Sequence, residues 1–287
     1  MNSPRDLRRR IKSIGGTAQI TRAMQMVAAS KMRKAQNAAI EAQAFARMLY
    51  RIQRSAITHA PGFEHPLLAA RDVRRRAVIL VAADKGLCGP LNTNVFRLAS
   101  QFDPDTTVFL AAGRKAAQFV ARTRRQLAAE FSYGDTPTFA EARAVGALAR
   151  DLFARGDVDE VRIVSTRFVN TLTQEPLVLE LLPIGEITTL QIPGIAHAAE
   201  PLDPAEAVFE PSSEWVLGYL LERYLNIYIY YVLLNAKASE QSARMVSMKN
   251  ATDSAETLIK DLKLEYNKLR QGNITKELLE IAGGQAE

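Results

Sequence analysis

The sequence predicts an α/β domain that carries a long antiparallel coiled coil, with the N- and C-terminal helices pairing as a protruding shaft. Both ends of the chain hold long helical patterns in which small or apolar residues recur at intervals of three and four. The middle shows short apolar runs that alternate with helical patterns, which is typical of a partly parallel sheet. The predicted parts are residues 1–60, 73–193 and 212–287, with residues 194–211 as a linker.

The first helical pattern begins at Pro4 and ends at Thr58, before Pro61 and Gly62 stop it. Alanine, arginine, lysine, methionine and glutamine dominate it, and all are good helix formers. The alternation continues for roughly five heptads, which favours a coiled coil over a helix of a globular core. Its seam positions are Ile11, Ile14, Ala18, Thr21, Gln25, Ala28, Met32, Ala35, Ala39, Ala42, Ala46 and Leu49.

The last helical pattern follows Ser212, a favourable N-cap residue, and contains no proline to its end. Its seam positions are Tyr231, Leu234, Ala238, Gln241, Met245, Met248, Thr252, Ala255, Ile259, Leu262, Tyr266 and Leu269. At ~1.5 Å per residue each helix spans roughly 80–110 Å, too long for one compact domain to enclose. Because the two patterns lie at opposite ends of the chain, they pair antiparallel if the middle folds at one end.

Both seams contain mainly small or polar residues, so the pair would bury little apolar area and be only modestly stable alone. This low stability predicts that a partner protein surrounds the two helices. A dimerising structural coiled coil is the alternative interpretation.

Four short apolar runs in the middle predict strands, at residues 77–82, 106–110, 161–165 and 176–181. Helical patterns lie between them, at residues 93–101, 115–125 and 139–154. We therefore expect a central Rossmann-like α/β domain. The glycines after the first run, Gly86 and Gly89, lack the spacing of a phosphate-binding loop. They favour a tight strand-to-helix turn, and no nucleotide site is expected.

No catalytic, cofactor-binding or metal-binding residues are predicted. Cys88 is the single cysteine, which excludes an internal disulfide and a multi-cysteine metal site. No motif links it to His59, His65 or His197, so a buried, unreactive cysteine is the better interpretation. The chain also shows no signal peptide and no apolar stretch of ~20 residues, and we expect it to stay on the cytoplasmic side.

The positive charge of the chain is concentrated in the first helix. The net charge is +6, whereas residues 5–54 contain twelve Lys and Arg against Asp6 and Glu41. Such a helix suits an acidic protein surface, nucleic acid or simply solvent. Phe45 and Tyr50 are the only aromatic residues in this segment that could stack on bases, and no nucleic-acid-binding module is recognisable. Nucleic acid is therefore the less favoured partner.

Three parts of the chain carry recognisable motifs. They are residues 20–34 (ITRAMQMVAASKMRK), residues 84–92 (DKGLCGPLN), and residues 243–253 (ARMVSMKNATD) with residues 274–281 (ITKELLEI). In this order they resemble the N-terminal helix, the central motif and the C-terminal signature of the gamma subunits of F-type ATP synthases, here of the bacterial kind. Ala83 and Pro90 stand where Ser and Gly are expected, which affects the turn and not the assignment.

The resemblance implies a central rotor shaft without a catalytic site of its own. Its partners would be the alpha and beta subunits, the epsilon subunit and the membrane c ring, whose rotation it couples to the conformations of beta. The implied location is the cytoplasmic face of the bacterial inner membrane, as a peripheral protein. A free-standing coiled-coil scaffold or a basic nucleic-acid-binding rod is the competing class.

The resemblance also implies roles for individual residues. Arg270 and Gln271 would form part of a polar catch against beta carboxylates. Arg244 would support the coiled coil near Met24. The bearing at the tip would include Ile274, Leu278 and Ile281.

Overall fold

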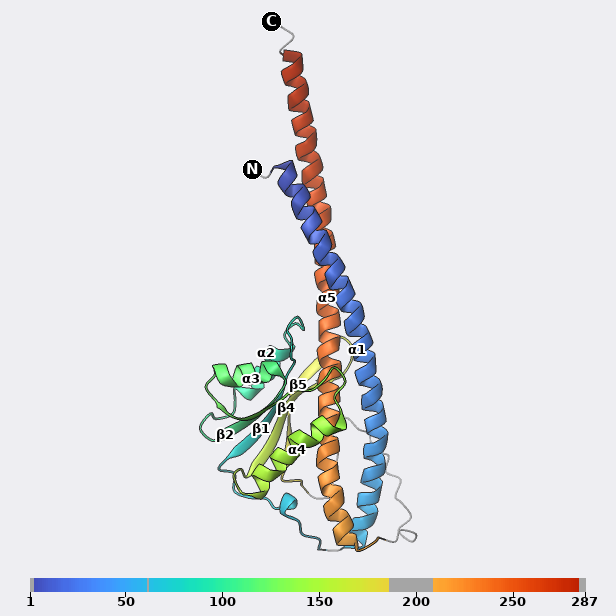
Figure 1. Ribbon diagram of the computed structural model, residues 1–287, viewed down its shortest axis with the longest axis vertical. Helices are drawn as coiled ribbons and strands as arrows, with labels where there is room; N and C mark the ends of the chain where they lie inside the picture. Colours follow the sequence, from blue (N-terminus) through green and yellow to red (C-terminus); the bar gives the residue numbers. More distant parts are fainter. Residues whose placement is uncertain (1–2, 61, 186–208, 284–287) are drawn as a thin grey trace. The chain divides into compact units, whose positions relative to one another are not determined.

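The computed structural model describes residues 3–60, 62–185 and 209–283 (Figure 1). The chain separates into two compact units, Met1–Ala28 with Arg244–Glu287, and Ala29–Ala243. Most of the predicted linker lies outside the described residues. Within these residues, none of the helices is long and apolar enough to cross a membrane.

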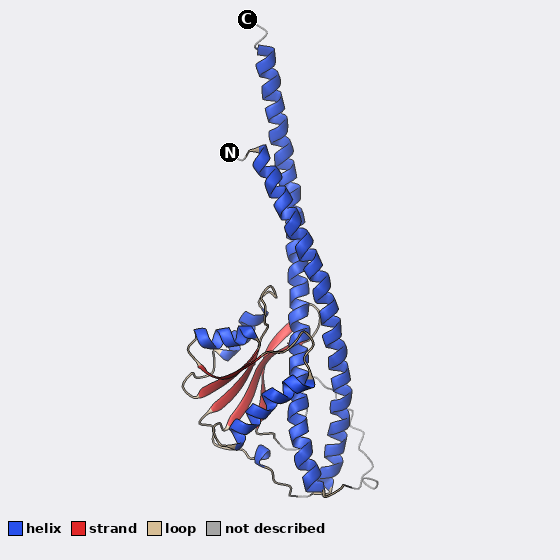
Figure 2. Ribbon diagram, in the orientation of Figure 1, coloured by secondary structure: helices blue, strands red, loops and turns tan. Residues whose placement is uncertain are grey.

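The chain has two long helices (Figure 2), and each contributes residues to both units. Helix α1 covers Pro4–Thr58, and α5 covers Ser213–Gly283. The limits of α1 are those predicted from the sequence. Proline is favourable in the first turn of a helix, which suits Pro4 as its first residue. The N–H of Trp215 donates to the Ser212 hydroxyl at 3.2 Å, which confirms Ser212 as the N-cap.

The two helices pair antiparallel, as predicted. In the larger unit, Gln43 donates to the Tyr231 hydroxyl at 3.2 Å, and Ala56 lies in one buried cluster with Leu217. Higher residue numbers on α1 thus lie opposite lower residue numbers on α5, as in an antiparallel pair. In the smaller unit the hydroxyls of Thr21 and Thr252 are hydrogen-bonded at 2.6 Å. Every predicted seam position is buried or half-buried.

The larger unit contains a five-stranded sheet with the order β3-β2-β1-β4-β5. The strands are β1 (Arg76–Val81), β2 (Thr107–Ala112), β3 (Gln126–Phe131), β4 (Glu160–Phe168) and β5 (Gln174–Leu182). All neighbouring strands are parallel except β4 and β5, which form an antiparallel pair. The four predicted strands are confirmed as β1, β2, β4 and β5.

Helices cover both faces of this sheet (Figure 1). They are α2 (Leu91–Ala99), α3 (Arg114–Arg122) and α4 (Phe139–Ala154), and the turn η1 (Pro66–Leu68) precedes β1. Val78 and Leu80 of β1 pack with α2 and α3, whereas Ile79 packs with α4 and α5. Because strand side chains alternate between faces, a continuous apolar run such as β1 fills both cores.

Strand β3 is absent from the sequence-based prediction. It lies at the edge of the sheet, where most of its side chains are exposed. Its sequence QLAAEF has neither an alternating pattern nor many β-branched residues. Its position comes from backbone pairing with β2, which leaves little trace in the side chains.

The carboxylate of Asp159 joins the starts of β1 and β4. It accepts the backbone N–H groups of Arg74 and Arg75 at 2.9 and 3.0 Å. These hydrogen bonds lower the pKa of Asp159, the bond from Arg75 being the larger cause. Since the folded pKa is lowered, the stabilisation is present above the unfolded pKa and is lost as pH falls through the folded pKa.

We expect Asp159→Asn to lower stability by about 0.5 kcal/mol at neutral pH, or about 1–2 °C in Tm, because solvent screens this partly exposed carboxylate. The difference from the parent chain should disappear in acid, where Asp159 is protonated. Thermal unfolding between neutral pH and acid measures this, with the neighbouring Asp157→Asn as the control. A difference that stays constant across this range would contradict the prediction.

Candidate functional site

The loop after β1 uses its polar groups for its own structure. The N–H of Ala83 donates to the Asn92 side chain at 3.1 Å, and the Asp84 carboxylate accepts the N–H of Arg114 at 2.9 Å. Asp84 thereby places a negative charge at the N-terminus of α3, where a phosphate would otherwise be favoured. The prediction that Gly86 and Gly89 belong to a tight turn agrees with this arrangement, and Gly89 has a positive φ of 58°.

Cys88 is buried, as predicted. Its Sγ is 3.5 Å from Nδ2 of Asn92. His59 contacts the Ser55 carbonyl and His65 accepts the N–H of Leu67, so both have local structural contacts. His197 lies outside the described residues. In the ranges that the structure describes, no group of three or more His, Cys, Asp or Glu side chains could hold a metal ion.

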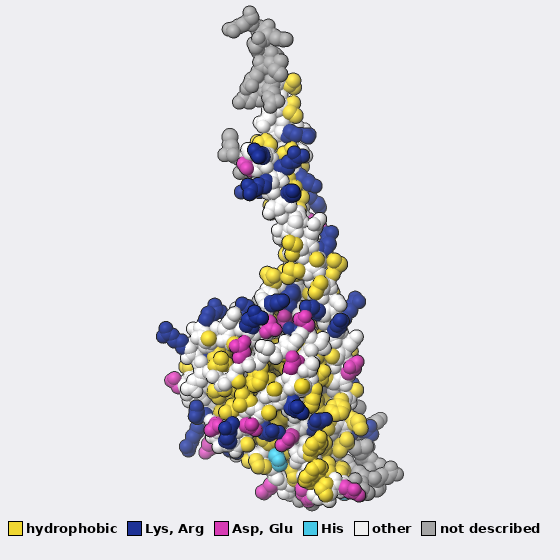
Figure 3. All heavy atoms as spheres, viewed as in Figure 1, with side chains coloured by type: hydrophobic (Ala, Val, Ile, Leu, Met, Phe, Trp, Pro, Cys, Tyr) yellow, Lys and Arg dark blue, Asp and Glu magenta, His cyan; other side chains and the backbone are white. Residues whose placement is uncertain are grey.

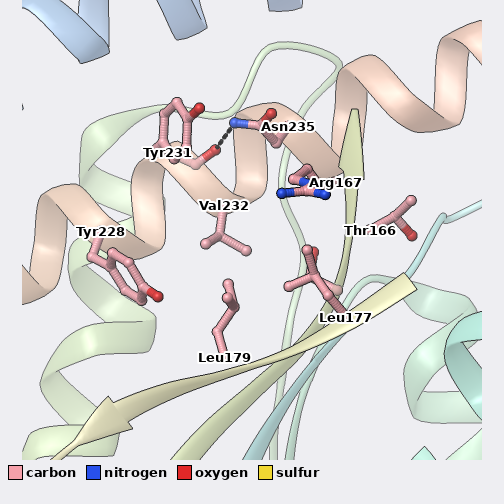
Figure 4. Close-up of a pocket in the computed structure, with 9 residues that line it drawn as sticks. Thr166, Arg167, Leu177, Leu179, Tyr228, Tyr231, Val232 and Asn235 are labelled. Carbon is pink, nitrogen blue, oxygen red and sulfur yellow. Dashed lines mark hydrogen bonds between the residues drawn. The ribbon is translucent and has the colours of Figure 1, made fainter. Parts of the chain in front are cut away.

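A small cavity lies between α5 and the antiparallel pair β4–β5 (Figure 4). Apolar side chains line most of it, and Asn235 is turned to the Tyr231 carbonyl, to which it donates at 3.0 Å. Its volume is about 20 Å³, enough for roughly one water molecule. Ligand pockets are far larger, of about 300–1,000 Å³. This cavity is therefore a packing gap and not a ligand site.

The predicted catch and bearing residues lie near the C-terminal end of α5. Arg270 and Gln271 are exposed, as are Ile274 and Leu278. Arg270, Ile274 and Leu278 are four residues apart in turn, which places them along one side of the helix. The smaller unit thus presents a cation and an amide followed by an apolar stripe, on a stretch of α5 that extends past the first residue of α1 (Figure 1). The side chain of Ile281 lies outside the described residues.

Arg244 and Met24 lie in the same unit. Arg244 is buried and Met24 is half-buried. An ion pair between Arg22 and Glu256 also joins α1 to α5 there, next to the hydrogen bond between Thr21 and Thr252. Sequence reasoning missed this ion pair because each partner resembles any charged residue on an exposed helix face.

The N-terminal turns of α1 form a basic band (Figure 3). We define the basic band by its exposed members Arg5, Arg8, Arg9, Arg10 and Lys12. The acidic residue within it, Asp6, is engaged by Ser3, whose hydroxyl donates to the carboxylate at 2.8 Å and lowers the pKa of Asp6. The band is therefore suited to a surface rich in carboxylates.

Comparisons with known proteins agree on one family. Residues 3–286 match the family described as ATP synthase. The ATP synthase gamma chain of Opitutus terrae is 45% identical over 290 residues, covering 99% of this chain and 98% of the relative. That of Methylacidiphilum infernorum is 42% identical over 294 residues, covering 99% of both.

Solved structures show the same fold at lower identity. A chain of the Euglena gracilis mitochondrial ATP synthase, in an assembly of OSCP, F1 and c-ring, has a TM-score of 0.66 at 17% identity, covering 98% of this chain and 93% of that chain. A chain of the Tetrahymena thermophila mitochondrial ATP synthase central stalk and c-ring has a TM-score of 0.60 at 23% identity. It covers 81% of this chain and 99% of that chain. The architecture predicted from the sequence is thus the architecture of these chains.

Proposed function

Because this chain belongs to the ATP synthase gamma-chain family, we propose that it is the central rotor shaft of a bacterial F-type ATP synthase. It couples rotation of the membrane c ring to the conformational cycle of the catalytic beta subunits. The observation that carries this proposal is the pairing of two helices of 55 and 71 residues, of which the longer presents exposed Arg270, Gln271, Ile274 and Leu278 near its end. The fold alone does not distinguish a rotor from a scaffold, but family membership favours the rotor.

A shaft transmits torque only if each conformer of its partner prefers a different face of it. The two helices differ in charge, since the basic band is on α1, so the pair is asymmetric around its axis. Arg270 suits a catch because a guanidinium keeps its charge and its forked donors at any working pH. The apolar stripe after it suits a bearing, where weak and uniform contact permits rotation.

We also propose that the chain has no catalytic site of its own. The cavity between α5 and the β4–β5 pair is too small for a nucleotide, and Asp84 occupies the N-terminus of α3. A second cavity of about 440 Å³, between α4 and α5, is lined by side chains of these two helices and not by a glycine-rich phosphate-binding loop. Catalysis then belongs to the beta subunits, and the contribution of this chain is mechanical.

The proposed location is the cytoplasmic face of the bacterial inner membrane, where the chain is peripheral. Partner subunits hold it there, namely alpha and beta around the helices and epsilon and the c ring at the other end. The basic band then faces carboxylates of the surrounding subunits and not nucleic acid.

The test is ATP hydrolysis by purified alpha and beta subunits from the same organism, with and without this chain, beside the chain alone. We expect strong stimulation on forming a stoichiometric complex and no hydrolysis by the chain alone. A chain that forms no complex would instead support the scaffold interpretation, and hydrolysis by the chain alone would contradict the absence of a catalytic site.

A further inference from the structure

Four charged side chains of alternating sign lie together where the α/β domain meets both long helices. We call Lys31, Asp135, Lys237 and Glu240 the charged clamp. Lys31 belongs to α1, Lys237 and Glu240 belong to α5, and Asp135 lies in the loop between β3 and α4. All four lie in the larger unit.

Asp135 contacts a lysine of each long helix. Nζ of Lys31 is 2.6 Å from Oδ2 of Asp135, and Nζ of Lys237 is 4.0 Å from Oδ1. Lys237 has a second acidic neighbour, because its Nζ is also 3.1 Å from Oε2 of Glu240. One carboxylate of the domain is thus placed between two lysines that come from different helices.

Lys237 is held in a buried position by the same loop. Its side chain is 2% exposed and that of Glu240 is 4% exposed. The Lys237 ammonium also lies 5.2 Å from the centre of the Tyr133 ring, and the Tyr133 hydroxyl donates to the Ala82 carbonyl at 3.1 Å. Burial raises the pKa of Tyr133, which keeps this donor protonated. The clamp is thereby connected to the loop that follows β1.

The charged clamp lies close to the ends of the larger unit in the sequence. Lys31 and Glu240 lie within four residues of the points where the larger unit ends on α1 and α5. These are the last turns at which the domain holds the helices. Beyond them, each helix continues into the smaller unit.

Neither close ion pair of the charged clamp adds much net stability, because solvent screens the partly exposed Lys31–Asp135 pair and desolvation offsets the attraction in the buried Lys237–Glu240 pair. Such pairs can nevertheless fix geometry. Sliding either helix by one residue moves its lysine ~1.5 Å along the axis and opens the contact with Asp135. An apolar contact of similar area would tolerate such sliding better, since apolar attraction has no direction.

Resting on the proposed rotor function, we propose that Asp135 is a positioning residue that locks α1 and α5 to the α/β domain, so that torque passes into both helices without slippage. Its partners in this role are Lys31 and Lys237. Asp135 acts through the helices and contacts no reacting group.

The test uses the complete, membrane-reconstituted complex and compares ATP hydrolysis with ATP-driven proton pumping. In Asp135→Asn we expect unchanged assembly and hydrolysis, while protons pumped per ATP fall about two- to fivefold, the factor expected for a modest ion pair. Asp135→Glu should restore pumping, because it keeps the charge. Glu175→Gln is the matched control, since it breaks a similarly exposed ion pair with Arg167 in the same domain.

A second variant, Lys31→Met, removes the other partner at a partly exposed position. It should reduce pumping by no more than Asp135→Asn does, because it leaves the Lys237 contact of Asp135 in place. The double variant should be no worse than Asp135→Asn alone, because Asp135→Asn already removes the contact with Lys31. Equal pumping per ATP in the parent, Asp135→Asn and Glu175→Gln complexes would overturn the clamp. So would a parallel fall in hydrolysis and pumping together with a lower Tm of the chain, which would indicate a structural role only. Failure of the parent chain itself to assemble would instead refute the rotor function.

Discussion

Replacing Arg270 with alanine is expected to lower ATP-driven proton pumping about tenfold, while the amount of assembled complex stays unchanged. Arg270 is exposed near the end of α5, and we propose that its guanidinium donates charge-assisted hydrogen bonds, worth about 1.5–3 kcal/mol each, to carboxylates of a surrounding partner. A loss of about 1.4 kcal/mol from a contact made in only one conformer of the partner gives a tenfold change in rate. Pumping into inverted vesicles measures the effect, with subunit stoichiometry measured in parallel.

Lys268→Ala is the control for Arg270→Ala, because residues two positions apart do not share a face of a helix. The Lys268 side chain is also exposed, so Lys268→Ala removes one exposed positive charge just as Arg270→Ala does. If the Arg270 variant pumped at the parent rate, Arg270 would not be part of a catch. If both variants were equally impaired, net charge rather than a specific contact would be responsible.

The largest expected effect on stability is that of Gly113→Ala. Gly113 connects β2 to α3 with a φ of 99° and a ψ of 145°, a conformation that is almost restricted to glycine. A Cβ at this position would also overlap the carbonyl oxygen of Ala82, which is backbone and cannot rotate away. We expect a loss of about 3–5 kcal/mol, the range of the most damaging single substitutions. Denaturant unfolding of the chain measures it.

The same chemical change at Gly15 should act in the opposite direction. Gly15 lies in the interior of α1, and a Cβ there meets nothing within 4 Å. Alanine is favoured over glycine in a helix interior by about 0.5–1 kcal/mol. A Gly113→Ala chain as stable as the parent would show that the turn after β2 can adopt another conformation.

The sequence was most informative where one physical pattern extends over many residues. The two long helices were predictable because helix formers and the 3-4 spacing persist from Ile11 to Leu49 and from Tyr231 to Leu269. The three inner strands β1, β2 and β4 were predictable because strands buried on both faces are continuously apolar, whereas the edge strand β5 was predictable from its own apolar run at residues 176–181. The long seam of α1 also includes Leu7, which is fully buried and precedes the predicted seam.

The remaining features depend on contacts between distant segments. Strand β3 is held by backbone hydrogen bonds at an exposed edge, so its side chains are not constrained to a strand pattern. In the sequence, Lys237 and Glu240 resemble ordinary charged helix residues, and the contacts of Lys237 with Tyr133 and Asp135 come from a loop about 100 residues away in the chain. The roles of Arg270 and Gln271 came from family resemblance, because no periodicity distinguishes them from other exposed residues.

The central claim is that this chain turns inside a ring of alpha and beta subunits. The most direct measurement fixes that ring to a surface and follows a probe attached to the α/β domain of this chain while ATP is supplied. The account predicts continuous rotation in one direction that stops when ATP is removed. A probe that stays still while the same complexes hydrolyse ATP at the full rate would contradict it.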